Sequence, residues 1–370
     1  MILAPSAFML DLYLRLAALD AGNVVVSPYS VEAALGMGFA GAEGKTALEM
    51  GRVLGQLEPA AFHQRWGRQA SALRSSAQES GARLNVANAL WGQRGHPFRK
   101  GFLDLVERQY GGHLESLDFK TDPERCRETI NSWVGRQTED KIRQLLGPGS
   151  LQNDSRLVLT NAVYFKAAWD EPFDEKRTTA QPFFTADGKQ ASVPLMVNSQ
   201  MALYAENSEF QAVDIPYRGD RLSMTILLPR RRDGLFALEK KLDSALLQSL
   251  IGGLKHERVI LRLPRFRFEF RKELSETLKA MGMNEAFRWP GADFSGIDGT
   301  RDLYVSLVIH QATIEVNESG TEATAATAMS MRAGSAPMTP VEFRADHPFL
   351  FLIRERSSGA VLFIGRLARP

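Results

Sequence analysis

The stretch Glu318-Ser319-Gly320-Thr321-Glu322-Ala323-Thr324-Ala325-Ala326-Thr327-Ala328 decides how this chain is interpreted. It follows an apolar run over residues 303–316, and it precedes residues 329–340, which contain two prolines and one glycine without periodicity. This order predicts a strand that runs into small residues and then into an exposed loop. Ala and Thr fit such a loop, but they also fit a central strand where neighbours leave little room. The segment is therefore able to exist in two states.

Size and composition describe an ordinary globular protein. The chain has 370 residues, of which 44% are hydrophobic and 24% are charged. A single core usually stops growing near ~250–300 residues, yet no linker, charge block or repeat divides this chain. We therefore predict one large domain over residues 1–370.

Several classes of partner are disfavoured. The net charge of +2 is too balanced to indicate nucleic acid binding, and Arg230-Arg231-Arg232 is interpreted as a solvated turn beside Asp233-Gly234. No apolar run approaches ~18 residues, so no membrane span is expected. Residues 6–20 predict an amphipathic helix and not a signal peptide. The single cysteine, Cys126, lies on a predicted helix and is assigned no chemical role.

The motifs of common enzymes are missing from the sequence. Residues 41–46 superficially resemble a phosphate-binding loop, but Phe39 occupies the position where that motif needs its first glycine. Neither a G-x-S-x-G nor an H-E-x-x-H motif occurs. The six histidines are scattered, and none has the spacing of a metal site. We expect no catalytic residue, no metal and no enzymatic activity.

Helix and strand signals are mixed along the chain. Helices are predicted at residues 6–20, from Pro28 through Phe39, and at 46–54, 99–110, 125–136, 236–250 and 271–281. Strands are predicted at 24–26, 83–91, 156–166, 210–215, 222–228, 258–270, 303–316, 349–354 and 360–366. The apolar phase of residues 258–270 switches at Pro264, which indicates a bulge or a strand edge. This mixture predicts an α+β fold with large antiparallel sheets.

Five segments, in order along the chain, resemble the serpin family of serine protease inhibitors. They are Ser27-Pro28-Tyr29-Ser30; Thr160-Asn161-Ala162-Val163-Tyr164-Phe165-Lys166 with Trp169; Ala292-Asp293-Phe294-Ser295-Gly296; Ile309-His310-Gln311-Ala312-Thr313-Ile314-Glu315-Val316-Asn317 with the stretch quoted above; and Phe343-Arg344-Ala345-Asp346-His347-Pro348-Phe349-Leu350-Phe351. The resemblance covers essentially the whole chain. It implies a single serpin domain with three β-sheets, roughly nine helices and an exposed reactive-centre loop at about residues 318–340.

The resemblance also implies a function and a partner. The expected function is suicide-substrate inhibition of a serine protease by a metastable monomer that undergoes a conformational change. The acyl-enzyme is trapped in a covalent complex when the cleaved loop inserts into the main sheet. Cysteine proteases form a second target class because they also form acyl-enzymes. The alternative is a non-inhibitory serpin that acts as a binding, carrier or chaperone-like protein. No cofactor is implied. Family resemblance slightly favours a secreted or periplasmic location.

Three groups of residues receive roles by resemblance. The hinge of the loop is Glu318, Gly320, Thr321, Glu322, Ala323, Thr324, Ala325, Ala326, Thr327 and Ala328. The shutter, where the central strands would part, is Ser27, Ser30, Asn161 and His310. The breach, where insertion would begin, contains Trp169 and Arg265, and Arg265 is expected to pair with Glu318. Each role has an alternative interpretation. The shutter residues are then unrelated polar residues whose hydrogen bonds are satisfied, Trp169 packs in the core, and Glu318 and Arg265 are solvated charges.

The small residues of the hinge suit insertion. Strand alternation places Thr321, Ala323, Ala325 and Thr327 on one face, and none of these is charged or bulky. Family spacing puts the reactive bond at Gly334-Ser335, with Arg332 and Met331 as alternatives. The small residues around Gly334 favour an elastase- or subtilisin-like target, whereas cleavage at Arg332 would suit a trypsin-like protease.

Overall fold

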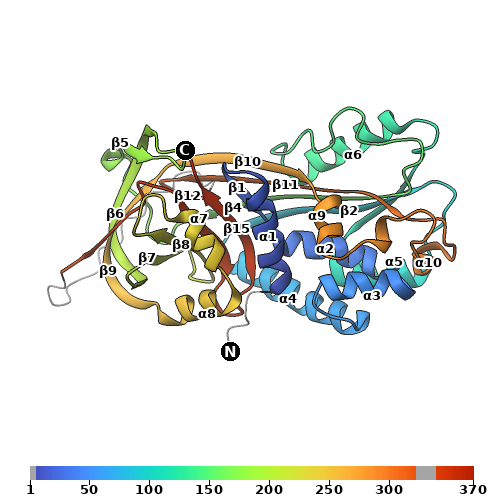
Figure 1. Cartoon of the computed structure of the whole chain (residues 1–370), viewed down its shortest axis with the longest axis horizontal. Coiled ribbons are helices and arrows are strands. Elements are labelled where there is room, and N and C mark those ends of the chain that lie inside the picture. The colour runs from blue at the N-terminus through green and yellow to red at the C-terminus, as the bar shows by residue number, and fades with distance from the viewer. Residues whose placement is uncertain (1–5, 322–338) are drawn as a thin grey trace.

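Two β-sheets and the helices packed on them form the described part of the chain, residues 6–321 and 339–370 of a computed structural model (Figure 1). The helices are α1 (Ala7–Leu19), α2 (Pro28–Phe39), α3 (Gly44–Val53), α4 (Pro59–Glu79), α5 (Lys100–Tyr110), α6 (Pro123–Gln137), α7 (Leu235–Lys241), α8 (Ser244–Gly253), α9 (Ser275–Ala280) and α10 (Ser295–Asp298), with 3-10 turns η1 (Glu175–Arg177) and η2 (Glu285–Phe287).

The smaller sheet has six strands in the order β10-β11-β12-β4-β2-β3. These strands are β10 (Phe266–Glu273), β11 (Val305–Asn317), β12 (Gly320–Thr321), β4 (Leu157–Ala168), β2 (Arg83–Gln93) and β3 (His113–Leu117). The two long central strands, β4 and β11, are buried along nearly their whole length. Their near-continuous apolar sequence follows from this, because structure covers both faces of the sheet.

The larger sheet has nine strands in the order β1-β15-β14-β8-β7-β6-β9-β13, with β5 paired to β6. These strands are β1 (Val24–Val26), β15 (Val361–Leu367), β14 (Phe349–Glu355), β8 (Leu222–Pro229), β7 (Phe210–Pro216), β6 (Gln190–Glu206), β9 (Lys255–Pro264), β13 (Val341–Arg344) and β5 (Thr179–Phe184). The 17 residues of β6 join two parts, because its start pairs with β5, most of its length with β9 and its end with β7. The described residues therefore form two hydrogen-bonded sheets where the resemblance implied three, because the long strand β6 joins its neighbours into one sheet.

Helices cover opposite faces of the six-stranded sheet (Figure 1). Helix α2 is buried throughout and contacts β4 and β2 of one sheet and β15 of the other. It begins as the sequence predicts, with Ser27 as N-cap and Pro28 in its first turn. Helix α6 lies on the other face and shares a separate apolar cluster with β4 and β11. Among the described residues, no helix is both long and apolar enough to cross a membrane.

Three predicted elements needed correction. Residues 258–270 are two strands in different sheets, β9 and β10, so the phase change at Pro264 marks a change of sheet and not a bulge within one strand. The helix predicted at 236–250 is interrupted because Asp243 caps α8. The helix predicted at 271–281 is confined to α9, since residues 271–273 belong to β10. The ten α-helices of the described residues agree with the roughly nine expected.

Candidate functional site

The candidate site is a seam between β11 and β4 in the six-stranded sheet. Along most of the seam the two strands pair directly and in parallel, from Val305 with Leu157 to Thr313 with Tyr164. At its head, β12 lies between them and pairs antiparallel with both, with Thr321 opposite Val316 and Ala167. We call the β12 end the head of the seam and the Val305/Leu157 end its foot. Thus β11 and β4 are paired directly at the foot, whereas β12 separates them at the head.

Gly320 permits the close approach of β12 to β4. Its φ is 155°, and a Cβ at this position would lie 2.1 Å from the Ala167 carbonyl oxygen and 2.7 Å from the Ala168 Cα. Both obstacles are backbone atoms, which cannot rotate away as a side chain can. Any residue larger than glycine would therefore push β12 out of this pairing.

Thr321 enters a buried aromatic site at the head of the seam. Its hydroxyl lies 2.6 Å from the Tyr217 hydroxyl, and Thr321 is 1% exposed. The Tyr217 ring stacks on Trp169 with centroids 4.6 Å apart, and the Trp169 indole N–H donates to the Asn317 carbonyl at 3.0 Å. The structure therefore brings Trp169 to the place where β12 enters the sheet. Tyr217 was not anticipated, because nothing near it in the sequence links it to this segment.

Glu318 and Arg265 form the expected ion pair beside this entry point. Arg265 Nη2 lies 2.6 Å from Glu318 Oε1, and the Thr178 hydroxyl donates to the same oxygen at 2.7 Å. Burial alone would raise the pKa of Glu318, but the hydrogen bonds from Arg265 and Thr178 outweigh it and lower that pKa. The carboxylate is therefore charged and firmly held at the base of the loop.

A buried polar network crosses the middle of the seam. His310 on β11 is hydrogen-bonded to the Asn161 side-chain oxygen on β4, and Asn161 Nδ2 donates to Ser30 Oγ and to Asn88 Oδ1. The Ser27 backbone N–H donates to His310 Nε2 at 3.3 Å. All four predicted shutter residues therefore meet, with Ser27 contributing its backbone. This network provides the polar contacts that would have to change if β11 and β4 separated.

His310 is neutral in this network. Because Nε2 accepts from Ser27, the proton resides on Nδ1, which donates to Asn161. Burial lowers the pKa of His310 to about 3, since desolvation disfavours the charged imidazolium. Asn88, the residue that sequence reasoning missed, interrupts the core-facing positions Val86 and Leu90 of its strand. A polar residue on that apolar face was the available signal.

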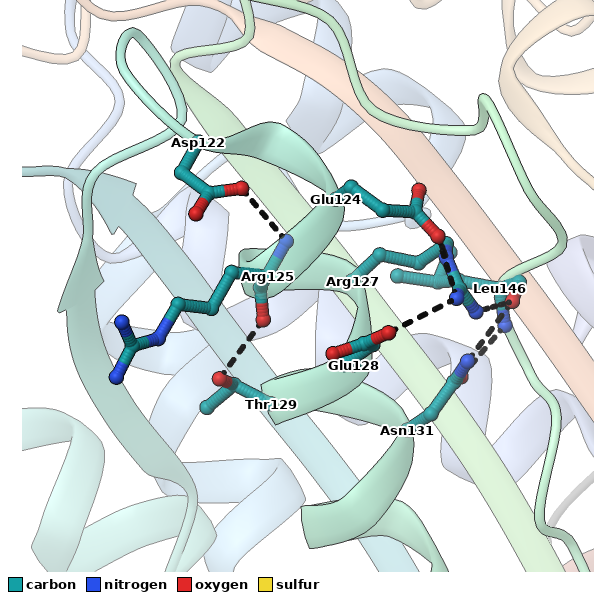
Figure 2. A network of polar contacts seen from close by, with 8 residues as sticks. All are labelled: Asp122, Glu124, Arg125, Arg127, Glu128, Thr129, Asn131 and Leu146. Atoms are coloured by element: carbon teal, nitrogen blue, oxygen red, sulfur yellow. Dashed lines mark hydrogen bonds and ion pairs between the residues drawn. The ribbon is translucent and has the colours of Figure 1, made fainter.

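A covering segment lies over the outer face of the seam. This covering segment is residues 138–146, which follow α6. Its Ile142 and Leu145 belong to the same apolar cluster as residues of both β4 and β11. Figure 2 shows how it is tied to the helix: Asn131 exchanges two hydrogen bonds of 2.8 Å with the Leu146 backbone, and Arg127 donates to the Leu146 carbonyl.

The covering segment is attached on both sides of the seam. Glu139 accepts hydrogen bonds from Arg83 and Asn85 of β2, and Arg271 of β10 donates to the carbonyls of residues 144 and 145. Separating β11 from β4 would move these two attachments apart. The segment would therefore have to stretch or release one of them.

The remaining predicted site residues lie outside the described part of the chain. These are the later hinge residues Glu322, Ala323, Thr324, Ala325, Ala326, Thr327 and Ala328, and the reactive-bond candidates Met331, Arg332, Gly334 and Ser335. Among the hinge residues, the structure places Glu318, Gly320 and Thr321.

Comparison with known proteins identifies the family. The model of the serpin (serine protease inhibitor) family matches residues 3–370. This chain belongs to the serpin family. An uncharacterised serpin-like protein of Thermococcus kodakarensis is 40% identical to this serpin, with 99% of this chain and 85% of that protein aligned. Human leukocyte elastase inhibitor is 37% identical, with 99% and 98% aligned.

The fold comparison gives the same result. The crystal structure of Serpin48 from the insect Tenebrio molitor, described as a highly specific serpin, matches this serpin with a TM-score of 0.88 and 30% identity. The match covers 98% of this chain and 96% of that one. The serpin fold and membership of a protease-inhibitor family are therefore established for this protein.

Proposed function

We propose that this serpin is a suicide inhibitor of serine proteases that works by inserting its cleaved loop into the seam. The observation that carries the proposal is the position of β12 at the head of the seam, where Gly320 and Thr321 already pair with both β11 and β4. Insertion of a serpin loop into a sheet is a known case of β-strand addition. Here the first two residues of the added strand are in place.

The covalent step is an ordinary acylation. The protease's catalytic serine oxygen attacks the carbonyl carbon of Gly334, and the bond between Gly334 and Ser335 breaks. The new amino group of Ser335 leaves with the proton taken from the serine, and an ester joins the enzyme to Gly334. Insertion of the loop then carries the ester along the sheet before water can hydrolyse it. A displacement of catalytic groups by ~1 Å can cost about a hundredfold in rate.

The register at the head of the seam specifies how the rest of the loop would pair. Each further residue of the loop moves one position back along both β11 and β4. If the pairing of Gly320 and Thr321 continues in this way, Thr324 would lie between Thr313 and Tyr164, and Thr327 would lie between His310 and Asn161. The Thr327 hydroxyl would enter the middle of the shutter network. It could replace the direct hydrogen bond between His310 and Asn161 that insertion must break.

Unsatisfied polar atoms beside the seam support the same register. Within the described part of the chain, the buried Thr313 hydroxyl and the Gln311 side-chain oxygen have no hydrogen-bond partner. Burying such groups without partners costs ~1–3 kcal/mol each. In the register above, Thr324 becomes the cross-strand neighbour of Thr313, and threonine pairs of this kind are stabilising. Insertion would thus relieve a cost that the intact sheet carries.

Energetics require the intact molecule to be metastable. New ladder hydrogen bonds contribute ~0.5–1.5 kcal/mol each, whereas ordering each residue costs ~1–2 kcal/mol. These terms nearly cancel, so pairing alone cannot drive insertion. The difference must come from relief of strain and of unsatisfied groups in the intact sheet.

The proposed target is an elastase- or subtilisin-like protease. The residues around the proposed bond, Ala333, Gly334, Ser335 and Ala336, are all small and suit a shallow specificity pocket. The similarity to a protein named leukocyte elastase inhibitor supports this choice. We infer that the inhibitor acts as a monomer and forms a covalent complex with one protease molecule.

Three measurements test the proposal. The protein is mixed with elastase, subtilisin or trypsin, and the products are separated on a denaturing gel. We expect a band at the summed mass with at least one of the first two, and mass spectrometry of the released fragment identifies the bond. The nicked protein should also melt well above the intact one. Cleavage by every protease without a covalent band would favour the non-inhibitory alternative, and unchanged melting after nicking would exclude loop insertion.

A further inference from the structure

A hollow of about 430 Å³ lies where the end of α1, strand β10 and the segment after β15 meet (Figure 1). Its volume is within the range of sites that bind small molecules. None of the residues assigned to the hinge, the shutter or the breach lines it. Insertion of the loop therefore gives this hollow no role.

Apolar side chains from two elements line the hollow. Leu16 of α1 and Phe270 of β10 are buried, Phe268 of β10 is half-buried, and Leu19 at the end of α1 is 63% exposed. A single exposed leucine is ordinary on a protein surface. Leu19, however, lies three residues after Leu16 on the same face of α1, so the exposed apolar surface continues into the core. The apolar body of a ligand would cover this surface.

Two cationic side chains line the same hollow. Strand alternation places Lys272 on the face of β10 that carries Phe268 and Phe270, and Arg369 follows β15. Within residues 6–321 and 339–370, neither the Lys272 ammonium nor the Arg369 guanidinium forms an ion pair or a hydrogen bond. An anion in the hollow would therefore meet two positive charges that no carboxylate of the described chain neutralises.

The acidic residues of the lining do not cancel these charges. Glu269 and Arg271 alternate with Lys272 and belong to the opposite face of β10. There Glu269 accepts from a side-chain amide of β11 at 3.1 Å, and Arg271 donates to the covering segment. Asp20 lies at the α1 side of the hollow, and its Oδ1 accepts a backbone N–H two residues along at 2.7 Å. Two free cations thus outweigh one occupied carboxylate.

The backbone of Arg369 is fixed beside the hollow. Asn23 Nδ2 donates to the Arg369 carbonyl at 2.6 Å, and Asn23 Oδ1 accepts from the Arg369 N–H at 3.0 Å. Gly22 leaves room for the guanidinium, because a Cβ there would lie 3.3 Å from Arg369 Nη2 and 3.1 Å from Asp20 Oδ1. A backbone held in place before a ligand arrives lowers the ordering cost of binding.

We propose that this hollow binds a small organic anion with an apolar body, namely an alkyl or aryl carboxylate. The apolar body lies against Leu19 and Phe268, and the carboxylate lies between Lys272 and Arg369. Hydrogen bonds between a carboxylate and such cations are charge-assisted and stronger than those between neutral groups. A neutral molecule of the same shape loses these bonds, and a cationic one is repelled. The site requires no protease and is independent of loop insertion.

The first test compares ligands that differ in charge. Isothermal titration calorimetry of the intact protein in low-salt buffer at neutral pH uses octanoate, 4-phenylbutanoate, octanol and octylamine. We expect saturable binding of at least one carboxylate, several-fold weaker binding of octanol, and no binding of octylamine, which is a cation at this pH. The tighter carboxylate indicates whether a lipid-derived or an aromatic acid is the natural class. Equal affinity for octanoate and octanol, or binding of neither carboxylate, would overturn the proposal.

The second test places the anion. Lys272→Gln and Arg369→Gln should each weaken carboxylate binding several-fold without changing octanol binding, whereas Leu19→Ala should weaken both alike. Arg52→Gln is the matched control, because Arg52 is an exposed cation on α3 that does not line the hollow. Added salt should weaken carboxylate binding to the wild type by screening, which requires no variant to fold. Unchanged carboxylate affinity in a protein with both Lys272→Gln and Arg369→Gln would contradict the proposal.

Discussion

Arg265 and Glu318 meet at the head of the seam, with Arg265 Nη2 2.6 Å from Glu318 Oε1. They are 53 residues apart in the chain, and the pairing of β10 with β11 brings them together, since Phe266 lies opposite Val316. The Glu318 side chain is 4% exposed and that of Arg265 is 47% exposed. The base of the loop is therefore held by an ion pair between a buried carboxylate, that of Glu318, and a partly solvated guanidinium, that of Arg265.

Reversing the charge of Glu318 should release the loop. In Glu318→Lys an ammonium group replaces the carboxylate and faces Arg265, with a cost of roughly 1–2 kcal/mol after allowance for the exposure of Arg265. We expect the variant to form oligomers on mild heating, as measured by size-exclusion chromatography.

Two further variants make this test specific. Glu315→Lys breaks a more exposed pair with Arg267 on the neighbouring strand and should remain monomeric. Adding Arg265→Glu to Glu318→Lys should restore much of the wild-type behaviour. A Glu318→Lys protein that survives heating as a monomer would argue against an anchoring role.

Acid should weaken the shutter through His310. Burial holds the pKa of His310 at about 3, below the ordinary value near 6.5. Below pH 6.5 the unfolded chain binds a proton that the folded state does not, so stability falls as pH falls from 6.5 toward 3. The loss from this group is about 2–3 kcal/mol between pH 6.5 and pH 4.5. Urea unfolding of the wild type and His310→Gln at several pH values measures it as a difference in slope.

His63 provides the control for this prediction. Burial also lowers the pKa of His63, to about 4. However, His63 lies on α4 and is hydrogen-bonded to the Tyr110 hydroxyl of α5, away from the seam. His63→Gln should also flatten the pH dependence of unfolding. We also expect acid to part the seam at His310 and cause oligomerisation, and this oligomerisation should be suppressed in His310→Gln but not in His63→Gln. If both variants suppress it equally, His310 has no special role at the seam.

A charge at Thr321 should convert the inhibitor into a substrate. Thr321 is buried against Tyr217, and a guanidinium placed there would lose its solvation without a partner. We expect Thr321→Arg to be cleaved with little covalent complex, so that several-fold more inhibitor is needed for each protease molecule inactivated.

Glu322→Arg is the matched control for Thr321→Arg, because alternation places residue 322 on the opposite face of an inserted strand. It should keep most of the inhibitory activity. Full one-to-one inhibition by Thr321→Arg would show that an uncharged residue at this position is not needed for insertion of the loop.

A methyl group at Gly320 should remove β12 from the sheet. The added Cβ would overlap the Ala167 carbonyl oxygen and the Ala168 Cα. The backbone N–H of Trp169, which donates to the Ser319 carbonyl at 3.0 Å, should then exchange with solvent faster in Gly320→Ala. Hydrogen exchange measured by mass spectrometry detects this change.

Gly101→Ala gives the comparison for Gly320→Ala. Nothing lies within 4 Å of the added methyl in α5, so this variant should leave exchange at Trp169 unchanged and be neutral or stabilising. Unaltered exchange at Trp169 in Gly320→Ala would mean that the close approach is not required.

Local pattern predicted many of the elements, and it failed where distant contacts decide. The apolar runs of β4 and β11 and the capping residues of α2 gave those elements directly, because burial and caps leave a local signature. Pro264 showed a break, but only the tertiary structure showed that the chain changes sheets there. The long polar helix α4 and the edge strand β3 were not predicted, since their residues carry weak periodicity.

The sequence by itself determined the residue types at the seam: small residues in the hinge, a carboxylate at its base, and polar side chains inside apolar strands. Only the tertiary structure decided that Thr321 meets Tyr217, that Asn88 joins His310 and Asn161, and that β12 already separates the strands at the head of the seam. The physical reason is that side-chain alternation follows from local geometry, whereas strand order and register depend on which distant segments exclude water together.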